Sequence, residues 1–207
     1  RVNQDAIRVG GTNSNGILVY SYAFMLGMNE AAKEAGDVKY DYYAKYDAGF
    51  TDPALGSTVA GTFFDNNANI VFADSGMVGD GITAKAKEVG RLSIQVDANL
   101  DEQQPGHVLT SVLKLTDVPG EKFVNALLDG SLASLDNLQT FGIASGGTDI
   151  TDLATISKYI VDQAAWKEIT DALAAKKQAI VDGTLKVLNA QIGETFDPSM
   201  VPNIVIK

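Results

Sequence analysis

The sequence predicts an α/β protein with a doubly wound, mostly parallel sheet. Segments typical of strands alternate with segments typical of helices between residues 38 and 114, as in parallel β-α-β units. The stretch 69–73 reads as a continuous apolar run, which is expected of a parallel strand covered on both faces. Glycine or polar residues stand where strands end, and ligands bind outside the carboxyl ends of strands in open α/β sheets. We therefore expect a ligand-binding rim at these strand ends.

The composition is that of a globular protein and excludes several classes of site. Of the 207 residues, 45% are hydrophobic and 20% charged, enough for a core in one large or two small domains. The net charge of −10 argues against a nucleic-acid partner, because such proteins usually carry a basic surface. The absence of cysteine excludes disulfides and thiolate chemistry, and no run of about 18 apolar residues could span a membrane. The chain begins at Arg1 without a signal peptide, so we expect a processed product or a fragment.

The first quarter of the chain predicts a strand, a helix and a second strand. A β-prone run at 5–9 precedes a glycine turn and a helix that ends at Gly36. The apolar face expected of this helix consists of Phe24, Met28, Ala31, Ala32 and Ala35. The strand 38–46 carries four tyrosines, which are Tyr40, Tyr42, Tyr43 and Tyr46. They either rim a ligand site or belong to a half-buried strand, and we favour the half-buried strand.

The middle of the chain predicts two helices between buried strands. Asp52 is placed to cap a helix that begins with Pro53. Glycines within 76–81 are expected to link the strand 69–73 to a second helix, and the strand 92–96 follows. The residues expected to be buried are Leu55, Val59 and Phe63 on the first helix, and Ile82, Ala86 and Val89 on the second.

The remainder predicts helices separated by short strands. Expected are a strand at 108–114, a helix from 118, a strand at 138–143, the longest helix at 163–181, and short strands at 185–187 and 204–206. A turn is expected at 145–147, where two glycines follow a serine. The residues expected to be buried are Phe123, Ala126 and Leu127 on the first helix, and Trp166, Ile169, Leu173 and Ile180 on the second.

No motif makes a positive case for catalysis. The glycine cluster within 76–83 has two glycines at the spacing of a phosphate-binding loop, but Ile82 stands where that loop needs lysine. Asp80 adds negative charge where phosphates would lie. His107 follows a Pro-Gly turn. Because it is the only histidine, a multi-histidine metal site is excluded. We expect no enzymatic activity, no cofactor and no metal site.

Four residues at or near strand ends are candidates for binding a ligand. Asp97 directly follows an apolar strand and can accept hydrogen bonds from sugar hydroxyls, and Lys114, at the end of another, can donate to the same ring. Phe50 can stack on a flat base or sugar face, and Gly76 lets a ligand approach bare backbone. From spacing alone, a helix cap, an ion pair and a core ring explain these side chains equally well.

Four linked motifs resemble the basic membrane protein family. They are the stretches 49–56, 73–81, 95–97 and 108–114, and the resemblance covers roughly residues 5–130. The family consists of substrate-binding lipoproteins of nucleoside ABC transporters. Its fold is the type I periplasmic binding protein fold, in which two α/β lobes joined by a hinge close on a ligand. The resemblance implies that this chain is mainly the C-terminal lobe.

The resemblance also implies roles for the candidate residues. Phe50 would stack on a purine, while Gly76, Asp97 and Lys114 would hold the ribose of a nucleoside. The protein would be extracytoplasmic, with a transporter permease as partner and no cofactor. The implied organisation is a ligand-binding lobe at 1–116, a crossover segment at 117–150 that packs on the N-terminal lobe, and a return helix with a tail at 151–207.

Two departures from the family pattern modify this expectation. After Asp97 the family commonly continues with Ser-Asp-Gln, whereas this chain has Ala-Asn-Leu-Asp at 98–101, so the ribose contacts implied by those family residues do not carry over. Most of the N-terminal lobe has no counterpart in the chain. We therefore expect that the lobe is supplied elsewhere or that the chain associates with itself. The alternative function is an interaction or regulatory module built on a truncated binding-protein lobe.

Overall fold

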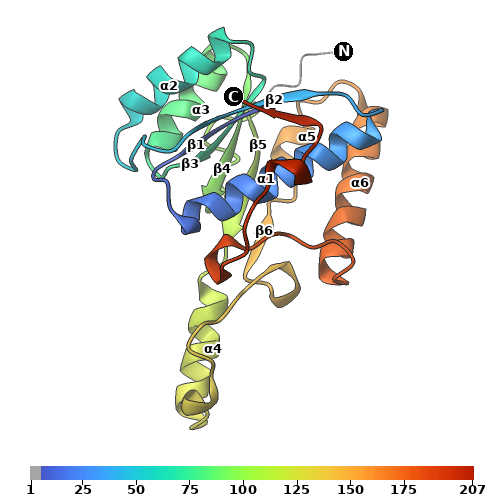
Figure 1. Ribbon diagram of the computed structural model, residues 1–207. Helices are drawn as coiled ribbons and strands as arrows, with labels where there is room; N and C mark the ends of the chain where they lie inside the picture. Colours follow the sequence, from blue (N-terminus) through green and yellow to red (C-terminus); the bar gives the residue numbers. More distant parts are fainter. Residues whose placement is uncertain (1–5) are drawn as a thin grey trace.

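A seven-stranded sheet organises the computed structural model, which describes residues 6–207 (Figure 1). The strands are β1 Ala6–Gly10, β2 Tyr40–Lys45, β3 Ile70–Asp74, β4 Leu92–Asp97, β5 Val108–Lys114, β6 Thr148–Ile150 and β7 Ile204–Ile206. Their order in the sheet is β6-β5-β4-β3-β1-β2-β7. Neighbouring strands are parallel except β5 and β6, which are antiparallel. The predicted doubly wound, mostly parallel α/β fold is confirmed.

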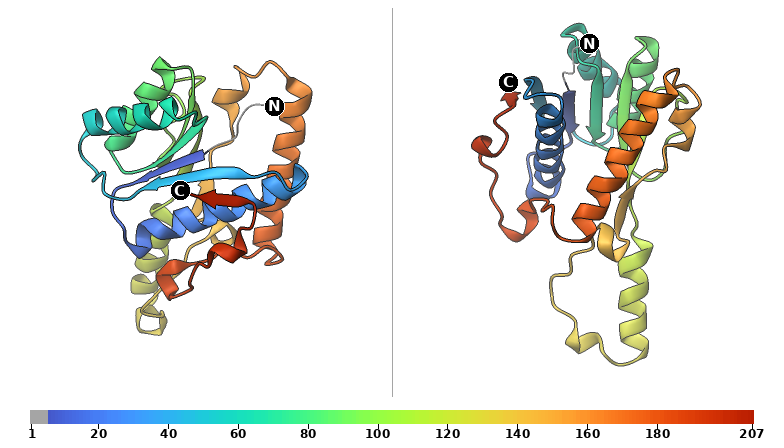
Figure 2. Two further views of the ribbon diagram at one scale, coloured as in Figure 1. Left: turned by 45° about the horizontal axis from the view of Figure 1, so that its top comes forward. Right: turned by 90° about the vertical axis from the view of Figure 1, so that its right-hand side faces the viewer.

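Helices cover both faces of this sheet (Figure 2). They are α1 Asn15–Glu34, α2 Pro53–Asp65, α3 Val78–Glu88, α4 Asp117–Leu128, α5 Ala154–Ser157 and α6 Gln163–Val181. Val71 of β3 belongs to the core beneath α2 and α3, whereas the next residue, Phe72, packs against Phe24 of α1 on the opposite face. Because β2 and β3 lie on opposite sides of β1, a topological switch point forms between β1 and β3.

Helices α2 and α3 approach each other closely through glycine. A Cβ atom at Gly81 would lie only 1.8 Å from the carbonyl oxygen of Pro53, the first residue of α2. Gly76, with a φ of +54°, stands in the turn before α3, whose first residue is Val78. The prediction that 76–81 is a linker is therefore wrong, because the later glycines lie inside the helix and allow this close packing.

The buried faces of the helices differ from those expected from local periodicity. On α1 the buried residues are Ser21, Met25, Asn29 and Ala32. Ala31 and Ala35, expected to be buried, are exposed. Asn29 is buried because its Oδ1 accepts a hydrogen bond from the backbone N–H of Asn203, at 3.0 Å. Val89, also expected to be buried, comes just after α3 ends and is exposed.

The region 138–150 contains a different strand from the predicted one. Residues 138–143 form no strand, whereas β6 pairs with β5. The turn expected at 145–147 is present, with Gly146 in the left-handed conformation at a φ of +73°. Residues 185–187 also form no strand, because they do not reach a sheet edge, whereas 204–206 pair with β2 as expected.

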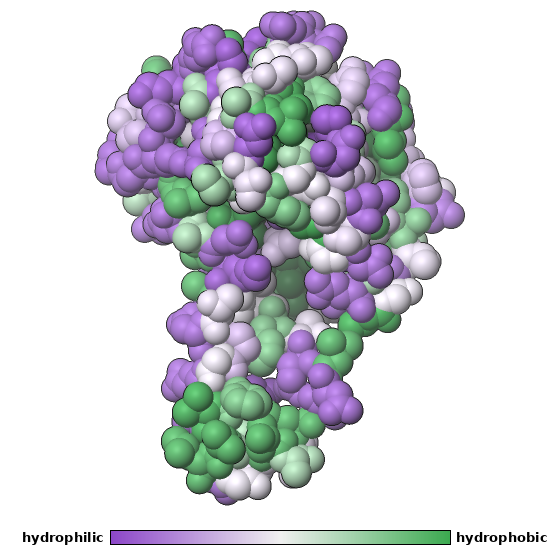
Figure 3. Space-filling model, turned by 90° about the vertical axis from the view of Figure 1, so that its left-hand side faces the viewer, coloured by the Kyte–Doolittle hydropathy of each residue, from purple (hydrophilic) through white to green (hydrophobic). Residues whose placement is uncertain are grey.

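An arm formed by α4 and residues 129–147 projects from the body of the protein (Figures 1 and 2). Ala126 is buried as expected, but Phe123 and Leu127 are 54% and 58% exposed. The exposed hydrophobic residues of α4, called the arm tip below, are Phe123, Val124, Leu127 and Leu128. Figure 3 shows the hydrophobic surface that gathers at this end of the molecule. The expected burial of Phe123 and Leu127 fails because no other element of the described residues covers this face of α4.

Helix α6 stands at the margin of the body and has no buried residue among those described. Its four expected core residues are half-buried or exposed: Trp166, Ile169, Leu173 and Ile180. Ion pairs attach it, with Lys176 Nζ 2.8 Å from Glu34 Oε1 of α1, and Lys177 bonded to Asp149 of β6. With 19 residues it is shorter than α1, which has 20, so the prediction that it is the longest helix is wrong.

The tail, residues 185–207, returns across α1 and ends in β7 (Figure 2). The ring of Phe196 stacks on Tyr22 of α1, with 4.8 Å between ring centroids. Val201 is buried, and the Lys39 ammonium donates to the carbonyl oxygen of Pro202 at 2.6 Å. These contacts make the tail an integral part of the body rather than a loose extension.

Candidate functional site

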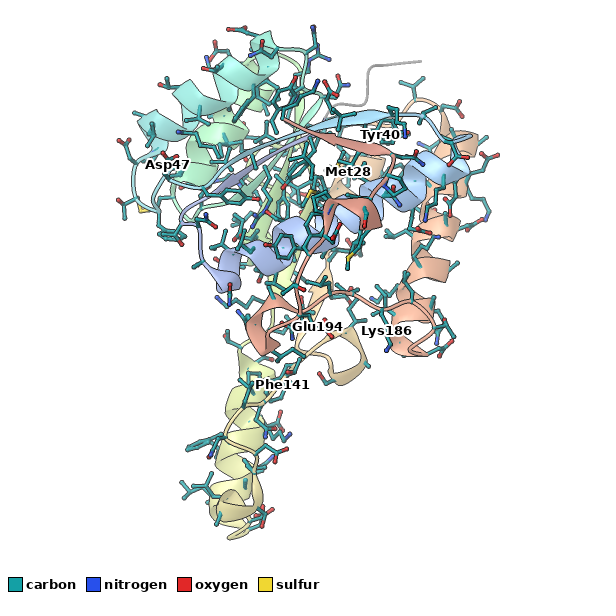
Figure 4. All side chains as sticks on the ribbon, viewed as in Figure 1. Met28, Tyr40, Asp47, Phe141, Lys186 and Glu194 are labelled. Carbon is teal, nitrogen blue, oxygen red and sulfur yellow. The ribbon has the colours of Figure 1, made fainter. Side chains whose placement is uncertain are left out.

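A cavity of about 690 Å³ lies at the carboxyl ends of the central strands. It is lined by all four residues selected from the sequence, Phe50, Gly76, Asp97 and Lys114. Asp74, the last residue of β3, also lines it, which places the cavity at the switch point between β1 and β3. The arm and the tail form further walls, through Phe141 of the arm, labelled in Figure 4, and Val187 and Asn189 of the tail. The structure thus brings the four candidates together, and their role in binding stays a prediction.

Asp97 and Lys114 lie side by side at the ends of β4 and β5. The Nζ atom of Lys114 is 3.5 Å from Oδ1 of Asp97, and the two side chains remain 60% and 57% exposed. The pair therefore keeps donors and acceptors available to a ligand. Asp97 has a φ of +73°, a left-handed conformation uncommon outside glycine.

Phe50 is held at the mouth of the cavity by close backbone contacts. Its carbonyl oxygen accepts a hydrogen bond from the backbone N–H of Met77 at 2.8 Å. A Cβ atom at Gly76 would lie 2.9 Å from that same oxygen, and one at Gly11 would lie 2.2 Å from Cε1 of the Phe50 ring. The ring is still 41% exposed, so it is not a core ring. The cap predicted next to it is confirmed, since Asp52 accepts from two backbone N–H groups of α2.

A buried ion pair at the base of the cavity was not selected from the sequence. Arg8 of β1 is fully buried and donates to the Asp74 carboxylate, to the Ser21 hydroxyl and to the carbonyl oxygen of Ile17. Burial raises the pKa of Asp74 to about 6, although the Arg8 guanidinium opposes this rise. Two signals pointed to the pair: Asp74 ends β3 as Asp97 ends β4, and Arg8 interrupts an apolar strand.

Tyr20 of α1 is the second missed residue of the cavity. Its ring contacts Phe72 edge-on at 6.4 Å between centroids. Burial raises the pKa of the Tyr20 hydroxyl, and the negative charges of Asp74 and Asp97 raise it further. The hydroxyl therefore stays protonated at neutral pH and can both donate and accept a hydrogen bond. In the sequence, only the position of Tyr20 on the helix face toward the strand ends could have indicated that it lines the cavity.

The other residues considered from the sequence lie away from the cavity. The four tyrosines of 38–46 do not line it, and Tyr42 is buried with its hydroxyl bonded to Ser21. The preferred half-buried-strand interpretation is therefore supported. His107 makes a 3.0 Å hydrogen bond through Nδ1 to the carbonyl oxygen of Arg91. Within residues 6–207, no group of three acidic or histidine side chains is arranged to hold a metal ion.

The chain matches a known protein family over most of its length. The family model Bmp, described as "ABC transporter substrate-binding protein PnrA-like", matches residues 3–184. The chain belongs to this family. Its members are substrate-binding proteins of transporters rather than enzymes. None of the helices formed by the described residues has the length and apolarity needed to cross a membrane.

Individual relatives and a solved structure agree with the family assignment. The ABC transporter nucleoside-binding protein BmpA of Lactococcus lactis subsp. cremoris is 24% identical over 86% of this chain and 51% of its own length. Basic membrane protein D of Borreliella burgdorferi is 31% identical over 46% of this chain and 28% of its own length. An ABC solute-binding protein of Aeropyrum pernix shares the fold, with a TM-score of 0.72 at 18% identity over 90% of this chain and 58% of its own. The chain spans about half the length of BmpA.

Proposed function

We propose that this chain forms one wall of the solute site of an ABC-transporter substrate-binding protein, and that the solute is a purine nucleoside. The observation that carries the proposal is the convergence of Phe50, Asp97 and Lys114 on one cavity from three separate segments of the Bmp-family fold. The name of the Lactococcus relative, a nucleoside-binding protein, supports the choice of solute class.

Each candidate residue has a chemical task in this proposal. The exposed face of Phe50 stacks on the purine ring, which combines apolar burial with a favourable ring geometry. The Asp97 carboxylate accepts hydrogen bonds from two ribose hydroxyls, and Lys114 donates to the same sugar. Gly76 has no side chain, so the ribose can approach the backbone beside Phe50.

A complete site requires a second wall. Binding pockets commonly bury about 70–90% of a small ligand, and the exposed Phe50, Asp97 and Lys114 side chains show how open this face is. Relatives of about twice the length have the additional residues to form that wall. We propose that an N-terminal lobe closes over the cavity, that the arm packs on that lobe, and that the closed form docks on a transporter permease outside the cytoplasm.

Titration calorimetry with a nucleoside panel tests the proposal. Inosine, guanosine, adenosine, uridine, ribose and the free bases are titrated into this chain, and into any longer natural form of the protein. We expect weak binding of purine nucleosides by this chain and tighter binding by the longer form. No binding by either would contradict the nucleoside proposal. Sub-micromolar binding by this chain alone would show that a second lobe is not needed.

The second candidate function is an interaction or regulatory module that no longer binds solute. The exposed arm tip is the observation that favours it, because large exposed hydrophobic surfaces usually mark contact sites. The same titrations separate the two candidates. A chain that associates through the arm tip but binds none of the panel would favour the module.

A further inference from the structure

The tail contributes a wall of the cavity although it lies outside the family match. The Bmp match ends at residue 184. Nevertheless Asn189, Gln191 and Ile192 line the same cavity as Asp97 and Lys114. Their 3₁₀ helix, η3 Ala190–Ile192, packs against α1, whose first turns line the cavity as well. The tail therefore lines the candidate site, and its residues lie beyond the part of the chain that the family model matches.

A closed turn holds the Gln191 backbone in place. Asn189 Oδ1 accepts a hydrogen bond from the backbone N–H of Gln191 at 3.0 Å. Glu194 Oε2 accepts one from the backbone N–H of Asn189 at 2.6 Å, and Gly193 has a φ of +90°. Ala190, between the two lining residues, is buried. Four neighbouring residues thus fix the position from which Gln191 projects.

The Gln191 amide lies against the first turn of α1. A Cβ atom at Gly16 would be 3.3 Å from Nε2 of Gln191, so the glycine leaves room for this amide. Across residues 6–207, no hydrogen-bond partner is found for the Gln191 side chain. Gln191 is exposed and lines the same cavity as the strand-end residues, and its amide offers an acceptor oxygen and two N–H donors to a ligand there.

We propose that Gln191 is a specificity-determining residue that hydrogen-bonds a polar group of the solute near the start of α1. The inference rests on the proposed nucleoside site and adds the tail to it. Asp97 and Lys114 bind the sugar that all nucleosides share, so they cannot distinguish one nucleoside from another. An amide that matches donors and acceptors on the solute can do so, because an unmatched buried polar group weakens binding.

Two matched pairs of variants test the inference. Gln191→Ala removes the amide, and Gln178→Ala is its control, because Gln178 lies on α6 outside the cavity and bonds Asp182. Gly16→Ala adds a methyl group against the amide, whereas Gly27→Ala adds one on the same helix with nothing within 4 Å. Calorimetry with the nucleoside panel measures affinity, and thermal unfolding without ligand measures stability.

Gln191→Ala is expected to weaken binding of the preferred nucleoside about two- to tenfold, as the loss of one neutral hydrogen bond predicts. The differences in affinity between nucleosides should become smaller. Gly16→Ala should change the ranking without lowering the unfolding temperature. Neither control should change the ranking, and Gly27→Ala should leave the unfolding temperature unchanged or raise it, because alanine favours helix over glycine. If the wild-type chain binds and ranks nucleosides and Gln191→Ala ranks them identically, the inference is wrong while the nucleoside site stands. If the wild-type chain and any longer form bind none, both proposals are wrong.

Discussion

Lys114 Nζ lies 3.5 Å from Asp97 Oδ1, at the ends of two neighbouring parallel strands, and both side chains are more than half exposed. Exposed ion pairs of this kind contribute only about 0–1 kcal/mol to folding. If a solute buried the Asp97 carboxylate and the Lys114 ammonium, the loss of each hydrogen bond to the solute would instead be costly. Substitutions at this pair should therefore separate binding from stability.

Asp97→Ala should weaken nucleoside binding more than Phe50→Ala. Losing Asp97 leaves ribose hydroxyls unpaired, at about 1–3 kcal/mol per group, whereas one stacking ring contributes about 0.5–1.5 kcal/mol beyond its area. Calorimetry on both variants measures the difference, with Asp47→Ala as a control, since Asp47 is an exposed carboxylate paired with Lys45. Equal affinities of the wild-type chain for a nucleoside and its free base would count against a ribose role for Asp97.

Gly81→Ala should destabilise the protein strongly. The added methyl group would lie 1.8 Å from the Pro53 carbonyl oxygen and would force α2 and α3 apart, which typically costs about 1–3 kcal/mol. Gly61→Ala on α2 is the control, since its nearest contact would be a flexible lysine carbon at 3.8 Å. We expect Gly61→Ala to be neutral or stabilising, because alanine favours helix by about 1 kcal/mol over glycine. Urea denaturation of both variants gives the comparison; similar midpoints would show that α2 and α3 can separate freely.

The Asp74 carboxyl should make stability fall as the pH rises from about 4 to 6. Its pKa is raised from 3.8 to about 6, so the folded state binds a proton that the unfolded state has lost in this window. Its stabilising contribution is complete below pH 4 and is lost as the pH passes 6, by at most about 1.4 kcal/mol per pH unit. The charged or titratable groups facing it are Arg8, Tyr20, Asp97 and Lys114.

Asp74→Asn isolates this contribution from those of other carboxylates. Denaturation of both proteins between pH 4 and 7.5 gives their free energies of unfolding. The value for the wild type, relative to that of the variant, should fall toward pH 6 and be constant above pH 7. Because the Asn side chain cannot lose a proton, the variant is expected to lack the fall in stability that the wild type shows between pH 4 and 6. Parallel curves across the whole range would mean that Asp74 is ionised in the folded protein from pH 4 upward.

The arm tip should drive association of this chain. Leu128 is 79% exposed and Phe123 is 54% exposed, and covering such side chains contributes about 1.5–3 kcal/mol each. Light scattering at high micromolar concentration should show dimers or larger species. Leu128→Lys should weaken association at least tenfold with little change in unfolding, whereas Asn125→Lys, which adds the same charge to α4, should do less. A clean monomer at these concentrations would contradict this prediction.

The strand ends and the cavity residues on them could be predicted from sequence because local patterns encode them. A buried parallel strand is a short apolar run, so its last residue, such as Asp97 or Lys114, is visible in the chain. Phe50 was found through the Asp52 cap beside it. The parallel order of the strands then brings these positions to one edge.

Contacts between distant segments could not be predicted in the same way. The Arg8–Asp74 pair joins residues 66 positions apart, and the hydrogen bond from the Asn203 N–H to the buried Asn29 joins residues 174 positions apart. The apolar stripe of α4 predicted that Phe123 and Leu127 are covered, and this is wrong for the described residues, because such a stripe carries no information about what covers it. Antiparallel β6 was missed because a three-residue edge strand, Thr148–Ile150, has no hydrophobic pattern of its own.

The pairing of β7 with β2 also constrains the order of folding. Tyr40 of β2 pairs with Ile204 of β7, 164 positions later, so the two strands meet only when this long loop closes. Loop closure must be completed before such distant contacts provide any stabilisation, which slows folding. During synthesis, β2 therefore remains an unpaired edge until the tail has emerged from the ribosome. An open sheet edge of this kind is a site of misassembly, so the nascent chain is most vulnerable to aggregation in the interval before its tail arrives.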